Sequence, residues 1–283
     1  ARYKKAFSRN ATAKFAAYAQ ALADGTAKVN ASAVYPYDVL KGLINHGFNA
    51  NFNTAQLQHI EAQWRALPDY VGSAPILPIV DTSGSMTWYN VPGSTVLKPL
   101  DVAVSLGLYC ADKNRGAFKD VFMTFSTTPE IVVLYGNIIE KITQMCHSNV
   151  GGSTDFEAAL MKVLDVGRRN NVRDEDMPKI LLVFSDMQFN GCTKRPNNRA
   201  IDMIRREYAA SGYIVPNIVF WNLKDHDNVP VRFDEQGTAM VSGFSPAVLK
   251  AILAGSVEGF TPESVMLEAV MKDRYSPTIS DVV

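Results

Sequence analysis

Three oxygen-bearing side chains follow a short apolar run in the stretch PILPIVDTSGSM. The run Ile76–Val80 has the composition of a buried strand, and Asp81, Ser83 and Ser85 come after it at alternate positions. In a tight loop that contains glycine, alternate side chains can converge on one point. Hard divalent cations prefer oxygen ligands, and Mg²⁺ takes about six of them at about 2.0–2.1 Å. The loop therefore predicts half of a metal site.

Two further residues, Thr154 and Asp186, are predicted to complete this site. Thr154 ends the stretch GGST, and Asp186 follows the apolar run LLVFS. Both positions are expected outside the carboxyl ends of strands, where ligands bind in open α/β sheets. Two carboxylates and three hydroxyls leave one coordination position for water or for an outside carboxylate. We expect Mg²⁺ here, with Mn²⁺ or Ca²⁺ as alternatives.

The elements that must position these residues form a repeating pattern after residue 75. Apolar or β-branched runs, expected as strands, alternate with amphipathic stretches, expected as helices at about 97–114, 138–145, 156–169 and 200–211. Such alternation predicts a mostly parallel sheet covered by helices on both faces. The expected fold class is therefore α/β, doubly wound and Rossmann-like, over residues 74–283. Two last helices are expected to begin at Ser245 and Thr261.

Residues 1–73 are predicted to form a helical region instead. Asn10 and Asn53 can cap two helices whose apolar residues recur at helical spacing, and a third helix is expected after Pro36. The first 70 residues carry an excess of four positive charges, although the whole chain has 28 basic and 28 acidic side chains. This excess is weaker than the basic stripe typical of nucleic-acid-binding proteins.

The composition indicates a globular protein in a reducing compartment. With 283 residues, of which 47% are hydrophobic and 20% charged, the chain can bury a sizeable core. Its three cysteines are too few and too scattered for a disulfide framework, so we expect a cytoplasmic location. No run of about 18 apolar residues occurs, and we expect neither a transmembrane helix nor a membrane partner.

The order of the five candidate ligands resembles the metal-ion-dependent adhesion site (MIDAS) of von Willebrand factor A-like domains. In that motif a D-x-S-x-S loop, a threonine in a glycine-rich loop and an aspartate at a strand end follow one another. The resemblance implies that Ser83, Ser85 and Thr154 coordinate the metal directly or nearly so, and that Asp81 and Asp186 act directly or through water. It also implies a protein partner that offers an Asp or Glu to the metal.

Longer stretches resemble the uncharacterised family related to TROVE/Ro ribonucleoproteins, in which a helical region precedes an A-like domain. They are spread over nearly the whole chain and include YKKAF, YPYDVL, QWRALP, FSDMQF, PNIVFWNL and VSGFS. The resemblance implies that residues 1–73 are the carboxy-terminal part of a TROVE-like helical domain and that residues 74–283 are the A-like domain. Because the family occurs in viral genomes, a virion-associated location is an alternative to a purely cytoplasmic one.

Each part of the predicted metal site also has a purely structural interpretation. Asp81 and the two serines could form only an Asx-type turn. Thr154 could simply cap the helix that follows it, and Asp186 could be a solvated strand end. The metal site is favoured because all these oxygens are expected at one edge of the sheet.

Catalysis is not expected. A phosphatase of the D-x-D-x-T kind needs a second acid where Ser83 stands, and a serine cannot act as a general acid at neutral pH. None of the four histidines lies in an informative motif. We therefore expect a protein that binds a partner through a divalent metal, as part of a larger assembly.

RNA binding is the alternative function, with contacts from the helical region. Basic residues there are interleaved with four aromatic residues, Tyr3, Phe7, Phe15 and Tyr18. Stacking on RNA bases would use such aromatics, but their helical spacing favours a helix core.

Overall fold

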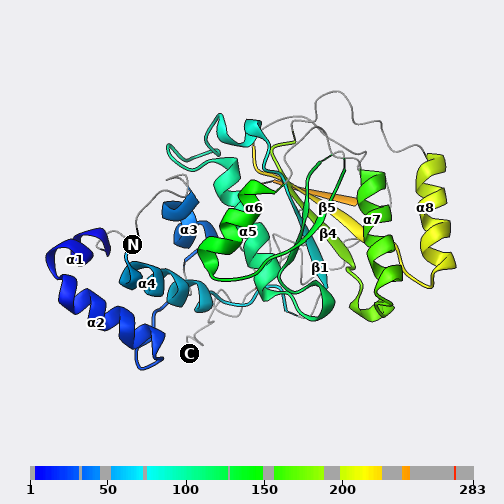
Figure 1. Ribbon diagram of the computed structural model, residues 1–283. Coiled ribbons are helices and arrows are strands. Elements are labelled where there is room, and N and C mark those ends of the chain that lie inside the picture. The colour runs from blue at the N-terminus through cyan, green and yellow to red at the C-terminus, as the bar shows by residue number, and fades with distance from the viewer. Residues whose placement is uncertain are drawn as a thin grey trace, which may run out of the picture.

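The structure is a computed structural model that describes residues 4–31, 34–44, 52–72, 75–126, 128–148, 156–187, 198–224, 238–242 and 271. Within these ranges, helices at the amino terminus precede a six-stranded sheet that has helices on both faces (Figure 1). The strands are β1 (Ile76–Val80), β2 (Val121–Thr124), β3 (Ile131–Val133), β4 (Ile180–Ser185), β5 (Asn217–Asn222) and β6 (Thr238–Ser242).

The strand order is β3-β2-β1-β4-β5-β6, and every neighbouring pair is parallel except β2 and β3. The chain goes from β1 to β2 on one side and returns to β4 on the other side of β1. This confirms the predicted α/β fold, with the Rossmann-like topology of von Willebrand factor A-like domains. Strands that follow β1 in the chain are added on one side of it until β3, and strands from β4 onward are added on the other side. The position between β1 and β4 is therefore a switch point, where open α/β sheets bind ligands.

Four long helices cover the sheet. Helices α5 (Pro99–Lys113) and α6 (Ile138–His147) lie on one face, and α7 (Phe156–Arg169) and α8 (Asn198–Ala210) lie on the other (Figure 1). Alternate residues of β1 pack into two separate cores, because successive strand side chains point to opposite faces. Ile76 and Val80 join the core under α5 and α6, whereas Leu77 and Ile79 join the core under α7 and α8.

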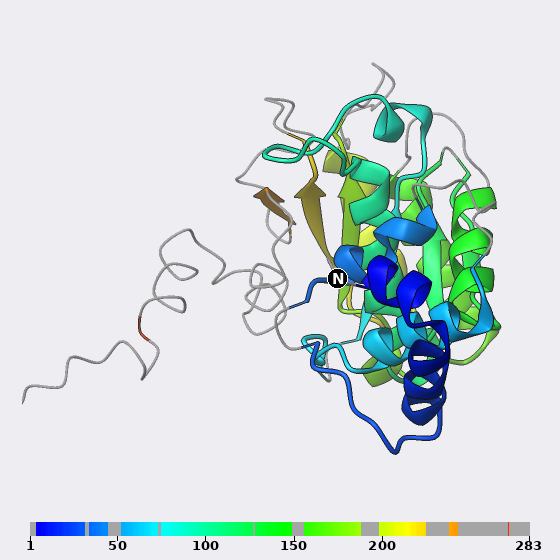
Figure 2. The same cartoon turned by 90° about the vertical axis from the view of Figure 1, so that its left-hand side faces the viewer.

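The amino-terminal helices are α1 (Lys4–Asn10), α2 (Thr12–Ala23), α3 (Pro36–Ile44) and α4 (Thr54–Arg65), and they lie in front in Figure 2. The predicted cap of α4 is confirmed, since Asn53 accepts from the Gln56 N–H at 2.9 Å in a capping box. The predicted cap at Asn10 is wrong. Asn10 ends α1, and Ala11 precedes α2 without a side-chain cap.

The helical region packs on α5 and shares its hydrophobic core. Leu40 of α3 and Trp64 of α4 belong to the same buried cluster as Leu106 and Tyr109 of α5. The Trp64 indole N–H also donates to Asp112 at 3.1 Å. Helices α3 and α4 therefore extend the helical layer that α5 forms on this face of the sheet.

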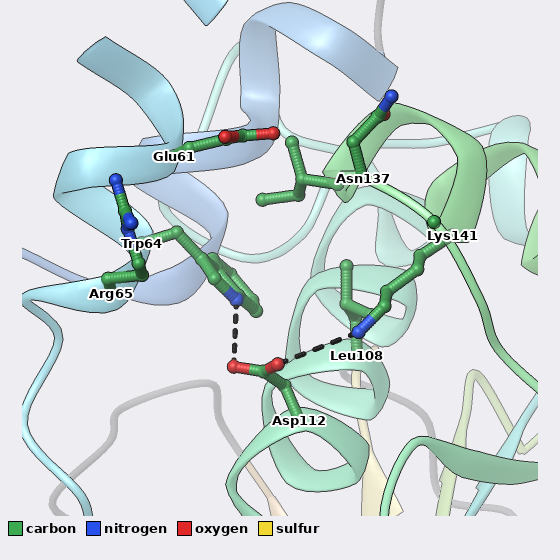
Figure 3. Close-up of a pocket in the computed structure, with 9 residues that line it drawn as sticks. Glu61, Trp64, Arg65, Leu108, Asp112, Asn137 and Lys141 are labelled. Atoms are coloured by element: carbon green, nitrogen blue, oxygen red, sulfur yellow. Dashed lines mark hydrogen bonds and ion pairs between the residues drawn. The ribbon is translucent and has the colours of Figure 1, made fainter. Parts of the chain in front are cut away.

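A pocket of about 320 Å³ lies at this junction, between α4, α5 and the start of α6 (Figure 3). Lys141 reaches across it to Asp112 at 3.7 Å and to Asp120 at 2.7 Å. Asp112 also accepts from Trp64, so Trp64, Asp112 and Lys141 link α4, α5 and α6 at the pocket.

Two expected elements cannot be compared with the structure. The helices predicted to begin at Ser245 and Thr261 lie outside the described residues. None of the helices in the described ranges combines the length and hydropathy needed to cross a membrane.

Candidate metal centre

The two candidate carboxylates meet where β1 and β4 end. The strands are parallel neighbours with Val80 opposite Phe184, and the Asp81 N–H donates to the Phe184 carbonyl at 3.0 Å. Asp81 and Asp186 thus follow adjacent strands at the switch point of the sheet. Asp186 is fully buried and Asp81 nearly so. The interpretation of Asp186 as a solvated strand end is therefore wrong.

The Asp81 carboxylate is fixed by two hydrogen bonds. Its Oδ1 accepts from the Ser83 N–H at 2.9 Å, and its Oδ2 accepts from the Ser185 hydroxyl at 2.6 Å. The first bond is the Asx turn considered as a structural alternative, and it orients the carboxylate. Burial raises the pKa of Asp81, the hydrogen bonds from Ser185 and Ser83 lower it, and the charge of Asp186 raises it further.

The two loop serines converge as predicted. The Ser83 and Ser85 hydroxyl oxygens lie 3.0 Å apart, at the start of the short 3₁₀ helix η1 (Gly84–Thr87). Adjacent ligands of an octahedral ion with bonds of about 2.1 Å are separated by about 3 Å, so the spacing fits a shared cation as well as a hydrogen bond. Thr154 lies outside the described residues.

The donor set fits a hard divalent cation. No group of three or more His, Cys, Asp or Glu side chains suited to a metal is found in the part of the chain that the structure describes. A metal held by the predicted residues would therefore have carboxylate and hydroxyl oxygens as its protein ligands. Such oxygen donors suit Mg²⁺, Mn²⁺ or Ca²⁺ rather than zinc, which prefers Cys and His.

Sequence reasoning missed Tyr89, Lys224 and Ser185. The Tyr89 hydroxyl donates to Asp186 Oδ2, and the Lys224 ammonium lies 3.2 Å from the centre of the Tyr89 ring. Burial raises the pKa of Tyr89, and so do its hydrogen bond to Asp186 and the nearby carboxylate charges. Burial lowers the pKa of Lys224, and the charge of Asp186 opposes that shift. Tyr89 thus contacts the fully buried Asp186 directly, and Lys224 contacts Tyr89.

Two of the missed residues come from distant segments. Tyr89 is 97 residues from Asp186, and Ser185 is 104 residues from Asp81. The only sequence signal was the position of Ser185 at the end of the predicted strand beside Asp186. The contacts themselves arise when β1, β4 and β5 align their carboxyl ends.

A known family covers the part of the chain that contains this site. Residues 76–277 match the family described as "Domain of unknown function (DUF7788)". The chain belongs to this family. The DUF7788 match begins at β1 and includes all five predicted ligands, so the candidate metal centre lies within the family's own domain.

Two similar proteins extend the comparison. "Uncharacterized protein L728" of Acanthamoeba polyphaga mimivirus is 28% identical over 274 residues, which are 94% of this chain and 45% of that protein. The crystal structure of the Deinococcus radiodurans RO (RSR) protein has a TM-score of 0.52 at 15% identity, covering 78% of this chain and 44% of that one. The expected relation to Ro proteins is confirmed at the level of the fold. This DUF7788 chain spans about half the length of both proteins.

Proposed function

We propose that Asp81, Ser83, Ser85 and Asp186, together with Thr154, hold a divalent cation through which the chain binds a protein partner. Mg²⁺ is the expected ion, and Mn²⁺ or Ca²⁺ are the alternatives. The observation that carries the proposal is that two buried carboxylates and two hydroxyls 3.0 Å apart follow neighbouring strands at the switch point of the sheet. The site would be of the MIDAS type.

The electrostatics of the cluster favour a bound cation. Burying carboxylates costs free energy unless opposite charge compensates them. Asp81 and Asp186 are both buried, and burial is the main cause of the raised pKa of Asp81, to which the charge of Asp186 adds. A bound divalent cation would place two positive charges beside these carboxylates and would offer a coordination position that a partner's Asp or Glu can occupy.

A partner-retention experiment tests this function. The immobilised chain is exposed to an extract of the cells in which the protein occurs, in Mg²⁺ or in EDTA, and the retained proteins are quantified by mass spectrometry. We expect a partner that is retained in Mg²⁺ and lost in EDTA. Asp81→Asn should abolish retention, because it removes a charge while it keeps the acceptor for the Ser83 N–H.

The matched control is Asp165→Asn, which changes a partly exposed carboxylate that pairs with Arg169 on α7. It should retain the partner as the unchanged chain does. Circular dichroism melts establish that both variants are folded. Equal retention in Mg²⁺ and EDTA, or by Asp81→Asn, contradicts the proposed function.

The similarity to a Ro protein favours a second candidate, an RNA-binding component of a ribonucleoprotein of the TROVE/Ro kind. That comparison lends RNA binding more support than it lends metal-dependent protein binding. Phe7 and Tyr18 add to it, because both are exposed in helices that also carry the exposed Arg9 and Lys14. The expected helix core is confirmed for Phe15, which is buried, and is wrong for Phe7 and Tyr18; Tyr3 lies outside the described residues.

RNA binding is separable from metal-dependent binding by its salt dependence. Fluorescence anisotropy of a labelled single-stranded RNA should show an affinity that persists in EDTA and falls steeply with salt. Phe7→Ala should weaken it by removing a stacking surface. Tyr135→Ala, another exposed aromatic, is the control. Absence of RNA binding in EDTA, or binding insensitive to salt, contradicts this second function.

A further inference from the structure

One exposed tryptophan lies beside the candidate metal centre. Trp88 directly follows η1 and is 74% exposed, whereas Trp64 and Trp221 are buried. Its indole Nε1 lies 4.0 Å from the position that a Cβ on Gly84 would take. Gly84 separates Ser83 from Ser85, so the indole lies near the loop that carries both hydroxyls.

A cation lies at the same site. Lys224, which follows β5, places its ammonium over the ring of Tyr89, and Tyr89 bonds to Asp186. Cations over aromatic faces are held by the ring quadrupole. Lys224 therefore lies close to the carboxylates while its side chain stays partly exposed.

The charges define what this surface attracts. Asp81 and Asp186 are acidic and Lys224 is basic, and a divalent cation bound among them would add two positive charges. The surface then favours an anionic partner group, because complementary charge steers association and fixes register. Trp88 supplies the apolar contact beside it, and tryptophan is among the residues enriched at the energetic centres of interfaces.

We infer that Trp88, Tyr89 and Lys224 form a recognition rim that selects a protein segment in which an Asp or Glu lies near a large apolar residue. The acid would reach the metal and Lys224, and the apolar side chain would cover the Trp88 ring. The inference rests on the proposed metal-dependent function and names the partner segment that this function would use.

Phage-displayed random heptapeptides, panned against the full chain in Mg²⁺, test this rim. We expect enrichment of peptides that contain an acid with a large apolar residue one to three positions away. Binding of the enriched peptides, measured by fluorescence anisotropy, should weaken about tenfold or more in Trp88→Ser, in keeping with the loss of an interface tryptophan. Lys224→Met should weaken the same peptides and reduce the preference for the acid.

Tyr135→Ser is the matched control, since Tyr135 is 71% exposed but follows β3, the antiparallel strand, and so lies at the opposite edge of the sheet. It should leave peptide binding unchanged. The rim is overturned if no peptides are enriched, if they lack the apolar residue, or if Trp88→Ser binds them as the unchanged chain does. Peptides that need Trp88 yet bind equally in EDTA support the rim and contradict the metal-dependent function.

Discussion

Replacing Tyr89 with Phe should increase the affinity of the chain for Mg²⁺. In the structure the Tyr89 hydroxyl donates to Asp186 Oδ2. Asp186 is the carboxylate predicted to bind the metal directly or through water. A cation that binds the Asp186 carboxylate competes with this hydrogen bond. Phe keeps the ring under the Lys224 ammonium and removes only the competing hydroxyl.

The expected change in Mg²⁺ affinity follows from the strength of a hydrogen bond to a charged group. A hydrogen bond to a charged group contributes about 1.5–3 kcal/mol, and every 1.4 kcal/mol corresponds to about a tenfold change in affinity. Because Tyr89 is partly exposed, we take the lower end of this range. Tyr89→Phe should therefore bind Mg²⁺ about tenfold more tightly.

Isothermal titration calorimetry with MgCl₂ measures this change directly, and Tyr135→Phe serves as the control in an exposed tyrosine far from the site. An unchanged Mg²⁺ affinity in Tyr89→Phe would show that the hydroxyl does not compete with the cation. A weakened affinity would show instead that Tyr89 holds Asp186 in place for the ion. Either result refutes the reasoning.

Three further outcomes are expected. Ser185→Ala should weaken Mg²⁺ binding by about tenfold or more in calorimetry, because it removes the hydroxyl that orients Asp81, and unchanged affinity would contradict this role. Burial raises the pKa of Asp101 to about 6, so the native state binds the proton more tightly than the unfolded chain does. The contribution of Asp101 to stability should fall as pH rises from about 4 to about 6. In urea denaturation, the free energy of unfolding of Asp101→Asn should therefore change less over this pH range than that of the unchanged chain. Trp64→Phe should lower the free energy of unfolding by about 1–3 kcal/mol, because it leaves Asp112 without the indole donor, and an unchanged denaturation midpoint would refute that.

The elements around the site could be predicted because their signals are local. Five consecutive apolar residues set β1 at Ile76–Val80, and the bounds of α7 at Phe156–Arg169 follow from its amphipathic spacing. Strand ends bring Asp81 and Asp186 together once the sheet is parallel, so their proximity also follows from the pattern. The Asn53 capping box is another purely local signal.

The rest of the site depends on long-range contacts that no local pattern reveals. From the sequence alone, Tyr89 is an aromatic residue in a loop, and Lys224 is a solvated charge that follows a strand. They meet only because β5 lies beside β4 and because the loop after β1 folds back over the carboxyl ends of the strands. The error at Asn10 has a similar origin, since an asparagine between two helices can cap the second or end the first.

The central claim, a divalent cation held by the β1 loop and the end of β4, is tested most directly by calorimetric titration of the full chain with Mg²⁺. We compare the unchanged chain with the double variant Ser83→Ala/Ser85→Ala, which removes both hydroxyls and keeps both carboxylates. The prediction is one bound cation per chain, and loss or strong weakening of that binding in the double variant. Absence of Mg²⁺ binding by the unchanged chain, or equal binding by the variant, would contradict the claim.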